Sequence, residues 1–431
     1  MAAFKEALGE PLRVGLYSPF FGSTLGGGEK YLGVAAAVLR DTLPSAVVEL
    51  TGPVAIDVPR YERQLGLDFH GITVRSTLGR PGMLARRLAR IEPLRRYRDL
   101  VVSSRTIGAT AAYDLFLSMV YVVPAFTRAR RSVILCQFPY ELTPSSGAEP
   151  AGILKGLYRW PERALRPRLL GRGVDDFDLV VCQSDYVQEW VARRWHRGAT
   201  VVNPPIDVPG EEPDWTRKEP MILGVGRFFA RGHSKRQDLM VRAFRELCDE
   251  GLSGWTLQLV GGLQRDHAED VAFFDRVVEL AKGYPVGVHT DVSGEVLRDL
   301  YRRSPIYWHA AGFDVDGETH PEDLEHFGMT TAEAMGHGAV PVAIGRGGQV
   351  EVVETGISGF LWDDIEQMKA RTLQLVGSSA LRLAMGAAAR NRSMRFSRTA
   401  FGQNLIAALL PVLTELEAGP ELRLAPGGCQ P

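Results

Sequence analysis

The chain has 431 residues, more than one ordinary hydrophobic core accommodates, so we expect two or three domains. Its content of 45% hydrophobic and 23% charged residues is typical of a soluble globular protein and excludes a low-complexity or fibrous chain. The net charge is −1, yet residues 1–206 hold 27 Lys and Arg against 19 Asp and Glu, whereas residues 207–431 hold 23 against 32. This basic first half indicates either an anionic partner or membrane surface, or simply a solvated surface.

The cysteine pattern and the N-terminal residues indicate the cellular compartment of the protein. The four cysteines contain no Cys-x-x-Cys pair, which favours a reducing compartment and argues against a zinc site. Residues 1–13 include charged side chains and no long apolar run, so we expect no signal peptide, and no stretch reaches the ~18 apolar residues of a membrane span. Of the basic residues 43 are Arg and 7 are Lys, a bias typical of a GC-rich bacterial genome. We therefore expect a cytoplasmic bacterial protein.

A glycine-rich turn follows the first expected strand. Residues 13–18 read as a strand, residues 19–28 as a loop that ends in three glycines, and residues 29–40 as a helix. This layout allows backbone amides to approach a phosphate or a sugar. The glycines do not follow the Gly-x-Gly-x-x-Gly pattern, so a dinucleotide fingerprint is absent. The other interpretation is a plain tight turn.

The rest of the first half alternates strands with helices and contains one Arg-rich segment. Residues 83–100 include the basic stretch Arg86–Arg98, with apolar residues recurring near a period of 3.6. The segment is either a basic amphipathic helix that rests peripherally on an anionic membrane, at its inner face, or a solvated helix face. Further strands are expected at 46–50, 72–74, 113–120, 132–136, 177–183 and 200–202, and a helix capped by Ser184 at 185–195.

The second half repeats the alternation after a polar, proline-rich linker at 208–218. Strands that alternate with helices predict the α/β class, with parallel sheets covered on both faces. We therefore expect two doubly wound Rossmann-like domains facing a cleft, at 1–207 and 208–395, and a last helix with a tail at 396–431. The expected strands are 221–225, 256–260, 306–309, 340–344 and 360–361, and the expected helices are 236–250, 270–282, 294–303, 329–336 and 349–354.

The stretch Glu325 to Gly338, EHFGMTTAEAMGHG, carries the strongest functional signal. Glu325 lies just before the expected helix 329–336, and Glu333 lies about one turn inside it. Backbone N–H groups at a helix start attract an anion, and the flanking carboxylates can accept hydrogen bonds from hydroxyls. A sugar attached to a diphosphate supplies both kinds of group. Ligands of doubly wound sheets bind beyond the C-terminal strand ends, where this stretch is expected.

Two cations are expected at the same edge. Arg227 follows the strand 221–225, and Lys235 comes eight residues later, at the start of the next helix. Together they can neutralise a diphosphate and stabilise charge on a leaving group. Alone, such a pair is more often plain surface charge, but the neighbouring Glu325–Gly338 stretch favours a donor pocket.

These residues resemble a known family. The segment GVGRFFARGHSKRQDLMVRAF is similar to the donor-phosphate motif of the large retaining glycosyltransferase family four, which has the GT-B fold, and EHFGMTTAEAMGHGAVPVA resembles its Glu-x7-Glu motif. Four further segments are similar to parts of the same family: YWHAAG, VVNPPID, the glycine loop and residues 396–410. The resemblance covers nearly the whole chain.

The resemblance implies a role for each motif residue. Arg227 and Lys235 would hold the diphosphate, Glu333 the ribose hydroxyls, and Glu325 the transferred sugar near its reacting carbon. Gly27 and Gly28 would close on the diphosphate from the other domain. Family members need no metal and no cofactor, and the leaving phosphate helps to take the acceptor's proton. Backbone amides that would meet the sugar or distal phosphate belong to Phe327, Gly328, Met329 and Thr330.

One departure from the family concerns the acceptor side. Many members carry His where this chain has Gln137, and Gln cannot act as a general base, so its role there would be hydrogen bonding. The sequences of the C-terminal motifs resemble those of mannosyl-type members, which implies GDP-mannose as the first donor and a UDP-sugar as the second. The acceptor hydroxyl stays open between a lipid-linked, a glycan and a secondary-metabolite acceptor, and no nucleic acid is expected. The alternative is a catalytically silent nucleotide-sugar-binding subunit, which Gln137 supports.

Overall fold

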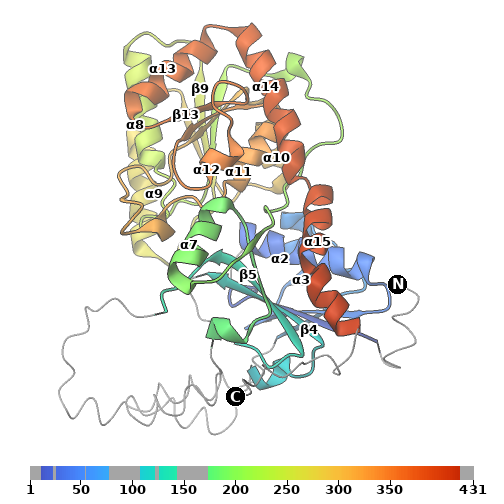
Figure 1. Cartoon of the computed structure of the whole chain (residues 1–431). Coiled ribbons are helices and arrows are strands. Elements are labelled where there is room, and N and C mark those ends of the chain that lie inside the picture. Colours follow the sequence, from blue (N-terminus) through green and yellow to red (C-terminus); the bar gives the residue numbers. More distant parts are fainter. Residues whose placement is uncertain are drawn as a thin grey trace, which may run out of the picture. The chain divides into compact units, whose positions relative to one another are not determined.

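The computed structural model describes residues 11–22, 26–53, 55–76, 107–121, 126–142 and 173–417. Its contacts divide the chain into two compact units (Figure 1). Unit 1 comprises Met1–Cys182, Gln188–Val202 and Gly402–Pro431, and unit 2 comprises Gln183–Val187 and Asn203–Phe401. The sequence-based boundaries after residues 207 and 395 stay predictions. The Arg-rich stretch Arg86–Arg98 lies outside the described residues, so its membrane-surface interpretation also stays a prediction.

Unit 1 contains a seven-stranded parallel sheet with the order β3-β2-β1-β4-β5-β6-β7. Its central strands are almost fully buried, as expected for strands covered on both faces. The strands are β1 (Arg13–Tyr17), β2 (Val47–Gly52), β3 (Thr73–Ser76), β4 (Leu115–Tyr121), β5 (Arg131–Phe138), β6 (Leu179–Cys182) and β7 (Thr200–Val201). Among the accompanying helices are α2 (Gly27–Thr42), α3 (Val58–Leu65), α7 (Asp185–Trp195) and α15 (Arg398–Glu417). Ser184 caps α7, because its Oγ accepts a hydrogen bond from the Val187 amide at 3.1 Å.

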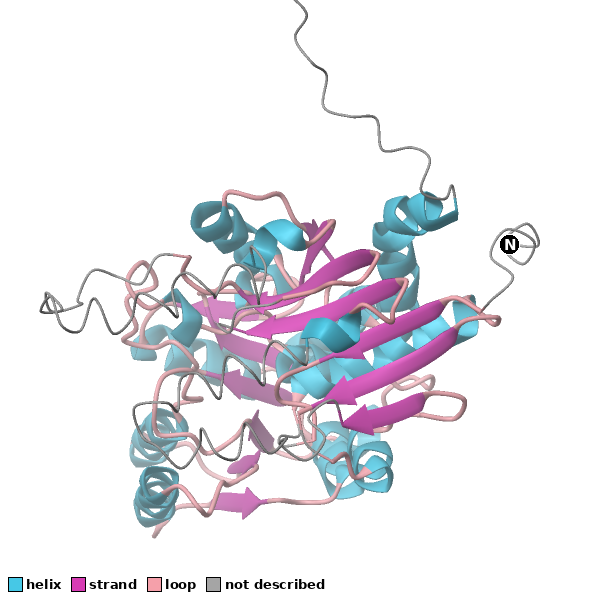
Figure 2. Ribbon diagram, turned by 90° about the horizontal axis from the view of Figure 1, so that it is seen from below, coloured by secondary structure: helices cyan, strands magenta, loops and turns pink. Residues whose placement is uncertain are grey.

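Unit 2 contains a six-stranded parallel sheet with the order β10-β9-β8-β11-β12-β13. Its strands are β8 (Met221–Val225), β9 (Thr256–Gly261), β10 (Val286–Thr290), β11 (Ile306–His309), β12 (Val340–Ile344) and β13 (Phe360–Trp362). Its helices are α8 (Gln237–Asp249), α9 (Ala268–Ala281), α10 (Gly294–Arg303), α11 (Met329–Gly336), α12 (Gln349–Val352), α13 (Ile365–Val376) and α14 (Ser379–Ser393). Strands appear as arrows and helices as coils around them in Figure 2. The predicted α/β class with two parallel sheets is confirmed.

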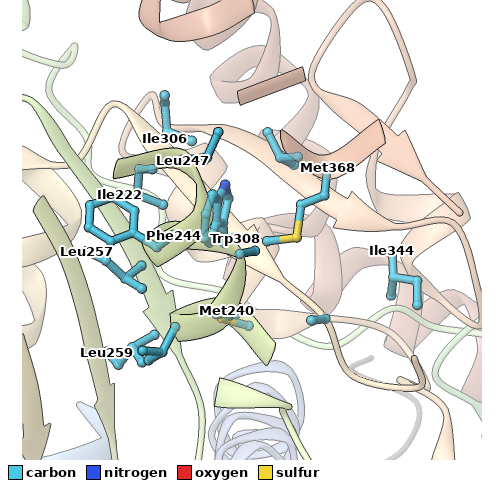
Figure 3. Close-up of a cluster of buried hydrophobic side chains, with 14 of the residues drawn as sticks. Ile222, Met240, Phe244, Leu247, Leu257, Leu259, Ile306, Trp308, Ile344 and Met368 are labelled. Carbon is cyan, nitrogen blue, oxygen red and sulfur yellow. The ribbon is translucent and has the colours of Figure 1, made fainter. Parts of the chain in front are cut away.

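The main core of unit 2 lies between its sheet and the helices α8 and α13. Phe244 of α8 contacts Trp308 of β11 edge-on, with 6.3 Å between ring centroids. Met368 of α13 and Ile222 of β8 belong to the same buried cluster (Figure 3). The Trp308 indole donates to Thr372 Oγ1 at 3.0 Å, so its one polar atom is satisfied inside the core. This packing fixes the strand β11, whose last residue enters the site described below.

Three elements of unit 2 were missed by the sequence analysis. Strand β10 lies at the edge of the sheet, and its half-exposed sequence VGVHT lacks the apolar run of a central strand. Helices α13 and α14 begin at the N-caps Asp364 and Ser378, whose side chains accept from Gln367 N and Leu381 N. These capping residues are the signal that would have predicted both helices.

Among the described helices, α15 alone is long and apolar enough to cross a membrane, by length and composition, over Arg398–Leu416. This finding corrects the expectation that no stretch reaches the length of a membrane span. The core accounts for much of its apolar surface, because Leu405 and Leu409 are fully buried. At its C-terminal end Glu415 pairs with Arg131 of β5 at 2.9 Å. These contacts are those of a helix packed on the sheet of unit 1.

Both sheets reverse their strand order at one point. In unit 1 the reversal lies between β1 and β4, and in unit 2 between β8 and β11. Because all strands are parallel, the chain segments that leave β8 and β11 emerge at the same sheet edge. Doubly wound sheets bind their ligands at such a point.

Candidate functional site

A buried ion pair joins the two segments that leave β8 and β11. Lys235 lies two residues before α8, and its Nζ donates to the carboxylate of Glu325, which lies four residues before α11. The two side chains are only 15% and 12% exposed. The structure thus pairs directly a cation and a carboxylate that the sequence pattern had placed only at the same edge of the sheet.

His309, the last residue of β11, completes this network. Its Nε2 lies 2.9 Å from Glu325 Oε2. Burial raises the pKa of Glu325, but the Lys235 charge and the His309 hydrogen bond outweigh it and hold that pKa well below its usual range. Burial lowers the pKa of His309. Glu325 is therefore an ionised carboxylate at neutral pH that accepts from a neutral imidazole.

A stacked pair of histidines adjoins this ion pair, and one of them approaches the Lys235 ammonium. The rings of His233 and His326 stack with centroids 5.1 Å apart. His233 Nδ1 lies 3.0 Å from the Leu324 carbonyl oxygen, so we assign its proton to Nδ1, which leaves Nε2 as an acceptor 3.5 Å from Lys235 Nζ. Burial lowers the pKa of His233 well below its usual range and that of His326 to about 4. Both rings are neutral at pH 7, so Lys235 is the cation of this cluster.

One glycine and a buried ring shape the start of α11, and a second glycine ends the helix. Gly328 is the N-cap of α11 and adopts φ = 109°, a conformation that disfavours any side chain. The Phe327 ring is 2% exposed and packs on Phe396, so Phe327 can offer a ligand only its backbone. Gly338, at φ = 77°, ends the helix, as predicted. The bounds Met329–Gly336 agree with the predicted helix.

The remaining predicted residues of unit 2 lie around this network. Glu333 of α11 is half-buried, and its Oε2 lies 3.4 Å from the Tyr301 hydroxyl. The Tyr307 hydroxyl lies 2.8 Å from Thr330 Oγ1, which fixes the first turn of α11 against β11. Arg227 is exposed, and its guanidinium lies over the Phe229 ring at 5.9 Å. Among the described residues it forms no ion pair with Glu325, so it is a second, separate cation.

In unit 1 the structure places Gly28 and Gln137 together. Gly27 begins α2 and is exposed, and Gly28 follows it. A Cβ atom on Gly28 would lie 2.5 Å from Gln137 Nε2, so the absence of a side chain there makes room for the carboxamide. Gln137 lies near the end of β5, and its Nε2 is 3.3 Å from Met119 Sδ. The glycine loop and the residue that replaces the family's His therefore adjoin.

Sequence reasoning missed the three histidines and Tyr307. His309 closes a buried strand at the ligand-binding edge of its sheet, and a polar residue at that position is a usable signal. His233 precedes Lys235 by two residues, and His326 follows Glu325, so their positions next to predicted residues were also informative. Only the fold shows that these side chains meet, since Lys235 and Glu325 are 90 residues apart.

The segment that contains this site resembles known proteins. Residues 211–392 match the family model "Glycosyl transferases group 1", a segment that contains Arg227, Lys235, Glu325 and Glu333. The chain is 26% identical over 235 residues to GDP-Man:Man(3)GlcNAc(2)-PP-Dol alpha-1,2-mannosyltransferase of Dictyostelium discoideum, covering 50% of this chain and 43% of that protein. It is 25% identical over 325 residues to an alpha-1,3/1,6-mannosyltransferase of Neurospora crassa, covering 67% and 65%. The chain therefore spans 43% and 65% of the lengths of these two relatives.

Solved structures share the fold over nearly the whole chain. Sucrose-phosphate synthase of Thermosynechococcus elongatus superimposes with a TM-score of 0.64 at 17% identity, covering 94% of this chain and 100% of that one. HepE of Anabaena, solved with UDP and glucose, gives a TM-score of 0.60 at 16% identity, covering 92% and 99%. At such identities the likeness establishes the fold, which is GT-B, as predicted. The segment 211–392 therefore belongs to the glycosyl transferases group 1 family, and it carries the Lys235–Glu325 network.

Proposed function

We propose that the chain is a metal-independent retaining hexosyltransferase that moves a hexose from a nucleotide-diphosphate sugar to an acceptor hydroxyl. The observation that carries this proposal is the ionised Glu325, held by Lys235 and His309 where β8 and β11 end. The fixed ammonium can hold the negatively charged phosphate of the donor. The fixed carboxylate beside it can stabilise positive charge that develops on the attached sugar.

The chemistry follows from this charge arrangement. In transfer with retention, the bond between the sugar's anomeric carbon and the phosphate oxygen breaks, and the acceptor oxygen bonds to the same face of that carbon. The acceptor's proton passes to the leaving phosphate. Lys235 and Arg227 stabilise the negative charge that grows on this phosphate, and Glu325 faces the positive charge that grows on the sugar. Glu333 and the backbone amides from Phe327 to Thr330 hold the ribose and the distal phosphate.

GDP-mannose is the first proposed donor and a UDP-sugar the second. Both curated relatives described above are named mannosyltransferases, and one name specifies GDP-Man. The second donor rests on HepE, which has been solved with UDP-glucose. We assign Gln137 to the acceptor side. The acceptor hydroxyl belongs to a lipid-linked, a glycan or a secondary-metabolite acceptor, and the choice between these three stays open. A cytoplasmic location remains part of this proposal.

Purified protein and a panel of nucleotide sugars test the proposal. Thermal-shift stabilisation identifies the donor, and release of nucleoside diphosphate reports turnover. Arg227→Ala and Glu333→Ala are each expected to lower turnover by about 10²-fold or more, because each removes a proposed donor contact. The matched control is Arg231→Ala, since Arg231 lies in the same loop but is exposed and pairs with Glu269 at 2.7 Å. Near-normal turnover in both site variants, with the fold intact, would refute the assignment.

The alternative, a silent nucleotide-sugar-binding subunit, rests on Gln137 in place of His. Such a subunit would show thermal stabilisation by the donor but release no nucleoside diphosphate with any acceptor or with water. Because the favoured reaction uses the leaving phosphate as the proton acceptor, Gln137 does not by itself prevent turnover. Release of nucleoside diphosphate by wild-type protein, abolished in Glu325→Gln, would exclude the silent subunit.

A further inference from the structure

Gln349, the first residue of α12, carries a polar side chain that lies inside the core of unit 2. It is fully buried, and neither its Oε1 nor its Nε2 has a hydrogen-bond partner within the described part of the chain. Buried side-chain amides are nearly always hydrogen-bonded, so an amide with both ends unsatisfied calls for an external partner.

The amide is aimed at the start of α11. A Cβ atom on Gly328, the N-cap of α11, would lie 2.2 Å from Gln349 Nε2, so the carboxamide occupies the space that the missing side chain leaves. Helices α11 and α12 lie side by side (Figure 1). The neighbouring Gly348 amide donates to the Glu325 carbonyl at 2.7 Å, which ties this loop to the residue paired with Lys235. Gln349 therefore borders the free N–H groups of the α11 first turn.

We propose that Gln349 contacts the donor: its Nε2 donates a hydrogen bond to the sugar-linked phosphate of the nucleotide-diphosphate sugar. This inference rests on the proposed function and adds a residue to it. A helix N-terminus favours an anion, and a carboxamide adds N–H donors without adding charge. Neutrality matters here, because a carboxylate at this position would repel both the phosphate and the ionised Glu325.

Three variants and two ligands test the contact by isothermal titration calorimetry. The ligands are the nucleoside monophosphate and diphosphate of the base that the donor panel identifies. Gln349→Met keeps the side-chain length and removes the hydrogen bond, and should weaken diphosphate binding about tenfold while leaving monophosphate binding unchanged. Gln349→Glu should weaken diphosphate binding further. Thr372→Val is the matched control for loss of a buried hydrogen-bonding group, since Thr372 is fully buried and bonds Trp308, and it should bind both ligands like wild type.

Each outcome decides the question. Wild-type diphosphate affinity in Gln349→Met and Gln349→Glu would overturn the contact. Equal losses for both ligands would also overturn it, since they would indicate that the amide only supports the fold, for example through a buried water. If Gln349→Met does not fold, Gln349→Asn retains the amide but shortens its reach, and should lose affinity for the diphosphate alone. If wild-type protein binds no nucleoside diphosphate, the proposed function itself fails, which separates the two failures.

Discussion

The two parallel sheets share a topology but differ in the chemistry at the edges where their strands end. Both sheets run their strands in parallel and reverse their order at one point. At the edge of unit 2, Lys235, Glu325 and His309 form a buried network of charge-assisted hydrogen bonds. At the edge of unit 1, a neutral carboxamide, Gln137, rests against Gly28 and Met119. One fold thus presents fixed charges in one unit and an adaptable neutral contact in the other.

This difference shows that the fold provides the edge and the side chains provide the chemistry. Fixed charges suit an anionic donor whose diphosphate is the same for every substrate. A neutral glutamine suits an acceptor hydroxyl, which carries no charge. We therefore expect substitutions in unit 2 to affect turnover and stability strongly, and substitutions at Gln137 to affect them weakly.

The largest expected effect comes from separating Lys235 and Glu325. Lys235→Met leaves the Glu325 charge buried without its cation, and should lower turnover by about 10³-fold and the free energy of unfolding by about 3 kcal/mol. Glu325→Gln should also abolish turnover, while the double variant should be more stable than the sum of the two single losses implies. Urea unfolding and nucleoside-diphosphate release measure these effects. Strictly additive stability losses would contradict a coupled pair.

Acid should weaken unit 2 through its neutral histidines. The ordinary pKa of a histidine is about 6.5, and burial lowers that of His326 to about 4, next to His233, Lys235 and the Glu325 carboxylate. As pH falls, the unfolded chain therefore takes up a proton at this histidine before the folded chain does. The contribution of neutral His326 to the free energy of unfolding is complete above pH ~6.5 and is lost as pH falls through about 4. It amounts to about 3 kcal/mol.

Urea unfolding followed from pH 7.5 to 4 measures this loss, and His326→Gln provides the comparison. The glutamine cannot take up a proton but can still donate to the Glu322 carbonyl, which His326 Nε2 approaches at 3.1 Å. The pH dependence of the unfolding free energy should be flatter in the variant. Identical pH profiles in the two proteins would show that His326 does not titrate in this way.

A smaller effect is expected where Gly28 meets Gln137. The Cβ of Gly28→Ala would press on Gln137 Nε2, the far end of a flexible side chain, so the carboxamide should move at a cost of about 1 kcal/mol or less. Combining Gly28→Ala with Gln137→Ala should remove this cost. The exposed neighbour Gly27, changed to Ala, is the control. Melting temperatures of the wild type, the two single variants and the double variant check the prediction. An equal loss of stability from Gly28→Ala in the presence and in the absence of Gln137 would contradict it.

The smallest effect is expected from Gln137→His, which introduces the residue that many family members carry. If the leaving phosphate takes the acceptor's proton, turnover should change by less than about tenfold, because general-base catalysis typically contributes 10²-fold or more. The pH–rate profile should keep its shape. A gain of 10²-fold with a new basic limb near pH 6.5 would instead assign proton transfer to unit 1.

The sequence by itself determined the elements that carry the motifs. The helix 329–336 follows from helix-forming residues between Gly328 and Gly338, and the structure gives these bounds. The parallel α/β class follows from alternating strands and helices, and the structure confirms it. The segments around Arg227 and Lys235 and around Glu325 and Glu333 resemble a known family, and the family model matches residues 211–392, which contain both segments. Their roles in the reaction stay predictions.

Only the tertiary structure decided which of these side chains meet. Contacts between residues far apart in the chain depend on strand order and packing, which local patterns do not encode. Lys235 and Glu325, 90 residues apart, pair because β8 and β11 are neighbours in the sheet, whereas Arg227 lies over Phe229 instead. Gln349 faces Gly328 for the same reason: α12 follows β12, the strand beside β11, so its first residue packs under the loop that starts α11.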